Sequence, residues 1–182
     1  YNVPSVIGFD ERVDIHALRQ ALAYLTDRHE SLRTVFRQDK GQPRQVILPS
    51  FTPELAVNDL CAADDGARAE AVRQAATEQA MHPFDLSAGP LARYRFLQLT
   101  PERGVLLLTL HHIVTDGWSM EVLSRELRLA YGAYRRGRQP SLPALPLQYA
   151  DYALWQRAHF VGKTRERQLA YWRQQLAAAE PT

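Results

Sequence analysis

Cysteine is almost absent from this sequence, which has one, Cys61, among 182 residues. A single cysteine excludes a disulfide within the chain and any zinc site built on cysteine pairs. It also makes a reducing, cytoplasmic setting the expected one. Four of the six histidines are scattered without metal-ligand spacing, so no metal site is predicted from them: His16, His29, His82 and His159.

Long apolar runs are missing too. The longest strongly apolar run, residues 104–110, is far shorter than the roughly 20 residues that a membrane-spanning helix needs. We expect no secretory leader, since no charged segment followed by an apolar one opens the chain. The net charge of +2 is too small to suggest nucleic acid, so neither a membrane nor nucleic acid is a predicted partner. Hydrophobic residues at 46% and charged residues at 23% exclude disorder of the whole chain.

The length fits one domain with a core of its own. Two features nevertheless suggest a piece of something longer. The chain opens at Tyr1 in the middle of an apolar stretch, and residues 121–182 carry 10 basic against 5 acidic side chains. We expect these to mark a cut or a docking surface.

Alternating and continuous apolar patterns predict five strands. Pro4 makes the first of them an edge or early strand, because proline cannot donate to the ladder. A turn at residues 40–43 makes two others a hairpin. The run at 105–110 is apolar throughout, which is typical of a central strand covered on both faces. The predicted strands are residues 1–9, 32–37, 45–48, 91–99 and 105–110.

Five helices are predicted between and after these strands. Asp14 is the expected N-cap of the first, in which Ile15, Leu18, Leu22 and Leu25 mark one face. A helix from Ser119 has its own apolar side, formed by Met120, Leu123, Leu127, Tyr131 and Tyr134. The remaining helices are expected at residues 63–81, 149–160 and 164–178. The pattern predicts a mixed α/β (α+β) sandwich of two layers, a mixed sheet with helices packed on it.

The segment that carries chemistry is residues 110–120, LHHIVTDGWSM, between the predicted central strand and a helix. In α/β folds, ligands often bind where strands end and helices begin. If the strand continues through His111 and His112, their side chains point to opposite faces and cannot share one role. We therefore expect one imidazole to face a reaction space and the other to pack or hydrogen-bond inside.

Asp116 follows in a tight segment that ends at Gly117. Its carboxylate is expected either to brace the loop by pairing with an arginine or to orient an imidazole, as in acyl-transfer enzymes. Gly117 permits either a close approach of the backbone to a substrate or a positive φ.

Residues 111–117, HHIVTDG, resemble the HHxxxDG motif of the condensation domains of nonribosomal peptide synthetases, a family of the chloramphenicol-acetyltransferase-like superfamily. Residues 28–36, RHESLRTVF, and residues 149–157, YADYALWQR, resemble two further motifs of the family, in the expected order. Residues 84–91, FDLSAGPL, are similar to a stretch common there. Four ordered similarities argue against chance agreement.

The resemblance implies a chloramphenicol-acetyltransferase-like fold, with residues 1–182 as the N-terminal lobe of a V-shaped, two-lobed domain. The first strand and motif and the C-terminal lobe would be missing, and the isolated chain is expected to be inactive. The implied reaction is amide-bond formation between an acyl or peptidyl thioester and an aminoacyl acceptor. Both substrates would arrive on the 4′-phosphopantetheine arms of peptidyl carrier domains, beside an adenylation domain, with no cofactor bound directly. Such enzymes belong to secondary metabolism, as in antibiotic or siderophore biosynthesis.

The resemblance also implies site roles. His112 matches the histidine that faces the reaction channel, as a base for the amine, a group that orients it, or a stabiliser of the oxyanion. His111 matches a structural histidine, and Gly117 lines the channel. Asp116 is expected in a structural ion pair, with Arg28, Arg33 or a residue of the missing lobe. Trp118 and Ser119 begin the next helix, in the channel or in a structural role.

The other motifs have plainer interpretations. Residues 28–30 are expected at a helix end, where a cation suits the helix dipole. Residues 149–155 are interpreted as helix packing with an exposed acid. A basic cluster is either a solvated helix end or a contact for an acidic carrier domain or its phosphate: Arg135, Arg136 and Arg138.

Several alternatives stay open. Residues 118–120, WSM, favour condensation over epimerisation, and the two histidines argue against heterocyclisation. The sequence around Asp116 and residues 145–157 favours an L-donor and an L-acceptor. Outside this reaction, the chain could be a non-catalytic carrier-docking module or a coenzyme A-dependent acyltransferase of the same superfamily. A zinc hydrolase using His111, His112 and Asp116 is disfavoured, because adjacent strand histidines diverge.

Overall fold

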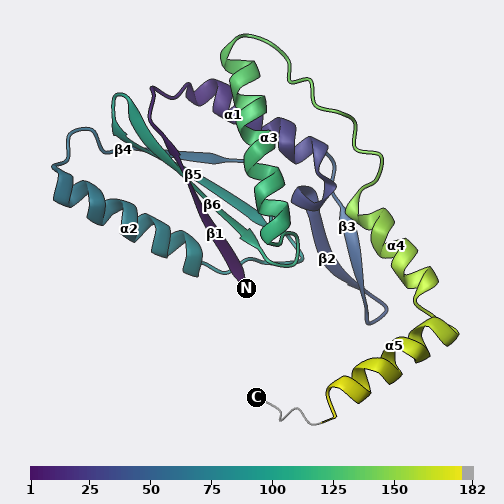
Figure 1. The fold of residues 1–182 in the computed structure, drawn as a ribbon. Helices are drawn as coiled ribbons and strands as arrows, with labels where there is room; N and C mark the ends of the chain where they lie inside the picture. Colours follow the sequence, from purple (N-terminus) through teal and green to yellow (C-terminus); the bar gives the residue numbers. More distant parts are fainter. Residues whose placement is uncertain (178–182) are drawn as a thin grey trace. The chain divides into compact units, whose positions relative to one another are not determined.

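The computed structural model describes residues 1–177 and divides the chain into two units, Tyr1–Leu145 and Pro146–Thr182. The first unit contains a four-stranded sheet, a separate two-stranded hairpin and three α-helices (Figure 1). Its elements are β1 (Asn2–Phe9), α1 (Ile15–Arg28), the 3₁₀ helix η1 (Glu30–Arg33), β2 (Thr34–Asp39), β3 (Gln42–Ile47), β4 (Leu55–Asp59), α2 (Asp65–Met81), β5 (Ala92–Thr100), β6 (Arg103–His111) and α3 (Gly117–Arg135).

The four-stranded sheet has the order β1-β6-β5-β4. β6 pairs antiparallel with β1 and with β5, whereas β4 pairs parallel with β5. The sheet is therefore mixed, as predicted, and β1 is an edge strand, as Pro4 indicated. The strand β4 was not predicted, because its five residues follow Pro53 and only Leu55 is buried.

β6 is the central strand that the sequence predicted. Leu106, Leu108 and Leu110 point into the main core, which α1 and α3 cover. Leu107 points to the opposite face, into a smaller cluster that α2 covers with Ala75. Figure 1 shows α2 on one side of the sheet and α1 and α3 on the other. The mixed α/β class, a mixed sheet with helices packed on it, is confirmed; helices cover both faces of the sheet, so the unit has three layers where two were predicted.

Helix α1 begins as its sequence pattern predicts. The Asp14 carboxylate accepts a hydrogen bond from the Ala17 N–H at 3.0 Å, which caps the helix. Leu18, Leu22 and Leu25 are buried on one face. The backbone N–H of Asp14 also donates to the Tyr131 hydroxyl at 3.0 Å, so the start of α1 is tied to α3.

The β2–β3 hairpin differs from its prediction at both ends. Its turn consists of Lys40 and Gly41 alone, with φ values of 49° and 76°. Two positive φ values are typical of a type I′ turn, which leads directly into paired strands, so Gln42 and Pro43 belong to β3 and not to the turn. At the other end, η1 takes the residues that the alternation assigned to the start of β2, and the strand begins at Thr34.

The second unit contains two helices, α4 (Tyr149–His159) and α5 (Gly162–Gln175), close to the ranges predicted. The Gln148 N–H donates to the Asp151 carboxylate at 2.8 Å and so caps α4. The predicted end of the last helix, at Ala178, lies outside the described residues. Across residues 1–177, no helix is long and apolar enough to span a membrane.

Candidate active site at the end of β6

The HHxxxDG segment joins the central strand to α3. β6 ends at His111, and residues 112–116 turn the chain into α3. The Val114 N–H donates to the His111 carbonyl at 3.0 Å, which closes the turn. The His112 N–H donates to the Tyr1 carbonyl at 2.8 Å, which holds the turn against the start of the chain.

The two histidines have different surroundings. The ring of His111 is partly buried and lies edge-on to Phe84, with ring centroids 6.1 Å apart. Its Nδ1 accepts a hydrogen bond from the Ile113 N–H at 3.1 Å, so the neutral ring carries its proton on Nε2. Burial lowers the pKa of His111, followed in effect by the charge of His112, and this favours the neutral form. His112 is exposed. β6 ends at His111, so His112 lies in the turn. The different surroundings of the two imidazoles therefore come from the turn and not from the alternation of side chains along a strand.

Asp116 is the N-cap of α3. Its Oδ1 accepts from the Ser119 N–H at 2.8 Å and from the Ser119 hydroxyl at 2.5 Å. These hydrogen bonds lower the pKa of Asp116, so the carboxylate is ionised near neutrality. The charge of His112 acts in the same direction. The helix starts at Gly117, two residues earlier than predicted, because the capping residue is Asp116.

Neither proposed arginine partner pairs with Asp116. Arg28 lies against the buried carboxylate of Glu126, with Nε and Oε2 2.9 Å apart. Arg33 donates to the Leu48 carbonyl at 2.6 Å and lies 3.6 Å from Glu30. Within residues 1–177, Asp116 has no ion pair, so the predicted pair with Arg28 or Arg33 is wrong. Arg28 instead joins the end of α1 to α3, and Arg33 joins η1 to Leu48, the residue after β3.

Gly117 and Trp118 lie at the exposed first turn of α3. Gly117 is not among the glycines with positive φ, which removes one of the two reasons proposed for it. A Cβ at this position would meet no atom of the described chain within 4 Å. Trp118 is 79% exposed, so within the described residues its indole is presented to solvent beside the histidine turn. The close approach of a substrate to the Gly117 backbone stays a prediction.

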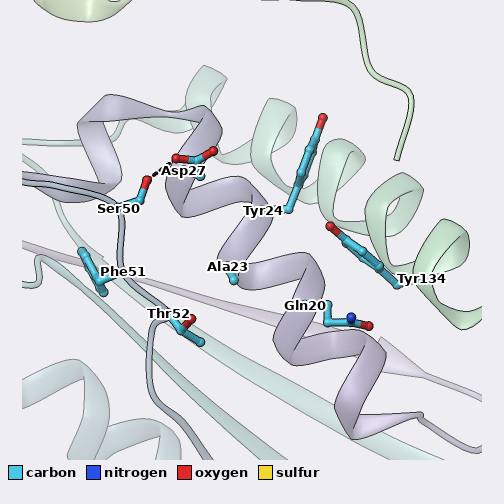
Figure 2. Close-up of a pocket in the computed structure, with 8 residues that line it drawn as sticks. All are labelled: Gln20, Ala23, Tyr24, Asp27, Ser50, Phe51, Thr52 and Tyr134. Carbon is cyan, nitrogen blue, oxygen red and sulfur yellow. Dashed lines mark hydrogen bonds between the residues drawn. The ribbon is translucent and has the colours of Figure 1, made fainter. Parts of the chain in front are cut away.

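A pocket lies on another part of the first unit. This pocket, of about 420 Å³, lies between the outer side of α1, residues 50–52 and the end of α3 (Figure 2). The Ser50 hydroxyl bonds to the Asp27 carboxylate at its rim. No residue of the HHxxxDG segment lines the pocket, so it is separate from the candidate site. In the described part of the chain, no group of three or more His, Cys, Asp or Glu side chains could hold a metal ion.

Three residues near the site or its supporting helices were not singled out from the sequence. Phe84 lies beside His111, Arg93 lies over the Phe84 ring, and Glu126 is the acid that binds Arg28 and His29. Phe84 opens the FDLSAGPL stretch, which was a usable signal. Glu126 had none, because nothing in the sequence of α3 distinguishes it from Glu121, the other acid of this helix, which is exposed.

Comparison with known proteins identifies the family. The sequence profile of the condensation domain matches residues 1–182. The chain is 45% identical over 181 residues to phosphinothricin tripeptide synthetase PhsC of Streptomyces viridochromogenes, covering 100% of this chain and 17% of that protein. It is 42% identical over 181 residues to chondramide synthase cmdD of Chondromyces crocatus, covering 100% of this chain and 5% of that protein.

Solved structures agree. SgcC5 of Streptomyces globisporus superposes with a TM-score of 0.84 at 31% identity, covering 100% of this chain and 41% of that one. The X-domain from teicoplanin biosynthesis gives 0.84 at 30% identity, covering 98% of this chain and 39% of that one. The chain therefore spans about two fifths of these solved chains and a small part of the curated synthetases. With the whole-length profile match and the predicted fold and motifs in place, the chain belongs to the condensation domain family.

Proposed function

We propose that this chain supplies the histidine-bearing lobe of a condensation domain that forms amide bonds. The domain would join a carrier-bound acyl or peptidyl thioester to a carrier-bound aminoacyl acceptor, as an L-donor to L-acceptor enzyme. One observation carries the proposal: an exposed imidazole, His112, lies in the turn that leads into a helix capped by the ionised Asp116, in a chain of this family. The C-terminal lobe would supply the rest of the site.

The reaction needs the protein mainly to position the two substrates and to assist the transfer of one proton. The acceptor amine attacks the thioester carbonyl carbon, a C–N bond forms and the C–S bond breaks. The proton lost by the amine passes to the departing thiolate. His112 is exposed to solvent and would accept this proton or orient the amine that loses it. A general base of this kind contributes about 10²–10⁴-fold to the rate. The Gly117 N–H, at the first position of α3, has no acceptor within the helix and is available to a developing oxyanion.

The two substrates would arrive on phosphopantetheine arms, and nothing in this chain needs to bind a cofactor of its own. Among the three arginines proposed for carrier docking, Arg135 is paired with Glu11. Docking by this cluster would therefore rest on Arg136 and Arg138, which are exposed at the end of α3.

The test uses the complete domain with donor and acceptor loaded on carrier proteins. His112→Ala is expected to lower turnover at least 100-fold, and His16→Ala, an exposed histidine on α1, serves as the matched control. Full turnover of the His112 variant would overturn the proposed role. The 182-residue chain alone is expected to give little or no product. If it binds a loaded carrier without turnover, the carrier-docking role gains support for the isolated chain, and transfer from coenzyme A by the complete domain would favour the acyltransferase alternative.

A further inference from the structure

The guanidinium of Arg93 fixes the segment that follows α2. Its Nη1 donates to the His82 carbonyl at 2.7 Å, and its Nη2 donates to the Pro83 carbonyl. The same group lies over the ring of Phe84, with Cζ 3.7 Å from the ring centroid. One β5 side chain therefore holds three successive residues, two through their backbone carbonyls and one through its aromatic face.

Phe84 carries this arrangement to the active-site turn. Its ring meets that of His111 edge-on, with an interplanar angle of 85°. His111 in turn accepts the Ile113 N–H on Nδ1, at 3.1 Å, and Ile113 is the residue after His112. The orientation of the His111 ring is thus coupled to the backbone on both sides of His112.

A buried amide fixes the same strands from α2. The Gln79 Nε2 donates to the Thr109 hydroxyl at 3.1 Å and to the Arg93 carbonyl at 3.4 Å. Arg93 and Thr109 are register partners on β5 and β6, and Thr109 lies two residues before His111. The backbone of Arg93 is therefore held by α2 and by β6. With this backbone fixed, we expect a change in the side chain of Arg93 or Phe84 to alter the packing of the His111 ring.

We propose that Arg93 and Phe84 are positioning residues for His112. They hold the His111 ring so that Nδ1 accepts the Ile113 N–H, and this bond shapes the turn that presents His112. The catalytic consequence rests on the proposed function, whereas the positioning itself is a property of this chain alone.

Positioning is tested first by the ring nitrogens of His111 in the 182-residue chain. Two-bond ¹H–¹⁵N spectra should show a single tautomer protonated on Nε2. Arg93→Gln and Phe84→Leu should each produce a mixture of tautomers, while Phe84→Tyr, which keeps the ring, should restore the original pattern. The matched control is Arg95→Gln, because Arg95 lies on the same face of β5 and also binds α2, through Glu78 at 2.8 Å. An unchanged His111 spectrum in both folded variants would overturn the proposal.

Turnover by the complete domain is the second readout. Arg93→Gln and Phe84→Leu should lower kcat about 10- to 100-fold with little change in KM, since misplacement of a reacting group costs about this much. Arg95→Gln should stay within about twofold. A changed spectrum with unchanged kcat, where His112→Ala is inactive, would overturn the link to His112. If His112→Ala is itself fully active, the proposed function fails, and the spectra still decide whether Arg93 and Phe84 position His111.

Discussion

Arg28 and Glu126, 98 residues apart in the sequence, form an ion pair in which Nε and Oε2 are 2.9 Å apart. His29 joins the pair through Nε2, 2.7 Å from the same carboxylate oxygen. Arg28 also donates to the Pro143 carbonyl at 2.7 Å, which ties the loop after α3 to the end of α1. Arg28 and His29, the first two residues of the RHESLRTVF segment, therefore join α1 to α3, which agrees with the structural interpretation of these residues.

Loss of this acid should destabilise the first unit. Glu126 is 7% exposed, so Glu126→Gln should lower the free energy of unfolding by about 1.5–3 kcal/mol, the value of hydrogen bonds to charged groups. Urea unfolding followed by circular dichroism measures it. Glu121→Gln, at an exposed position of α3, is the control and should change stability by less than about 0.5 kcal/mol. Equal stability of the two variants would contradict the role given to the pair.

The same group predicts a dependence on pH. Burial alone would raise the pKa of Glu126, but the hydrogen bonds and charges of Arg28 and His29 outweigh it and lower the pKa. A carboxylate whose folded pKa is lowered contributes stability above its unfolded pKa, near 4.3, and loses it as the pH falls through the folded value. The stability gap between the wild type and Glu126→Gln should therefore be full at neutral pH and shrink below about pH 4. A gap independent of pH would contradict this.

Asp116 should contribute to α3 as a cap as well as to the site. Asp116→Ala removes the acceptor of the Ser119 N–H and should cost about 0.5–2 kcal/mol. Asp116→Asn keeps an acceptor and should cost much less, so thermal unfolding of the two variants separates the cap from the charge. If turnover of the complete domain falls in Asp116→Asn while stability is kept, the charge acts at the active site. If Asp116→Ala unfolds like the wild type, the capping role is wrong.

Gly104 is required by the packing of β6 against β5. A Cβ there would clash with Phe96 Cζ and lie 3.1 Å from the Leu97 carbonyl oxygen, and Phe96 is fully buried. Gly104→Ala should destabilise the chain by about 1–3 kcal/mol, as overpacking does. Gly8 on β1 is the matched control, because a Cβ there meets nothing within 4 Å. Denaturant midpoints of the two variants decide the matter, and equal midpoints would show that Phe96 can move aside.

Gly117 should behave in the opposite way, because the described chain leaves space at its Cα. Gly117→Ala should leave the unfolding midpoint unchanged or slightly raised, since alanine favours a helix more than glycine does. Turnover of the complete domain should fall at least tenfold if a substrate passes close to this backbone. A stable variant with full turnover would remove Gly117 from the channel.

Much of the fold was predictable because its signals are local. The N-cap at Asp14 and the three- and four-residue spacing of Leu18, Leu22 and Leu25 depend only on helix geometry, and α1 follows them. The continuous apolar run of β6 predicted a strand covered on both faces, since a residue pointing either way must be buried. The HHxxxDG motif is also a local signal, and it located the candidate site at the junction of β6 and α3.

Tertiary contacts decided the rest, because they depend on which distant groups meet. The sequence could not pair Arg28 with Glu126, since several acids were equally available and only packing buries one of them. It could not find β4, whose pairing with β5 supplies the hydrogen bonds that a five-residue segment lacks alone. Local chemistry determined the helices, the central strand and the active-site motif. The fold decided that Arg28 binds Glu126, that Phe84 lies against His111 and that Arg93 lies over the Phe84 ring, because burial and hydrogen bonding select distant partners only once the chain is packed.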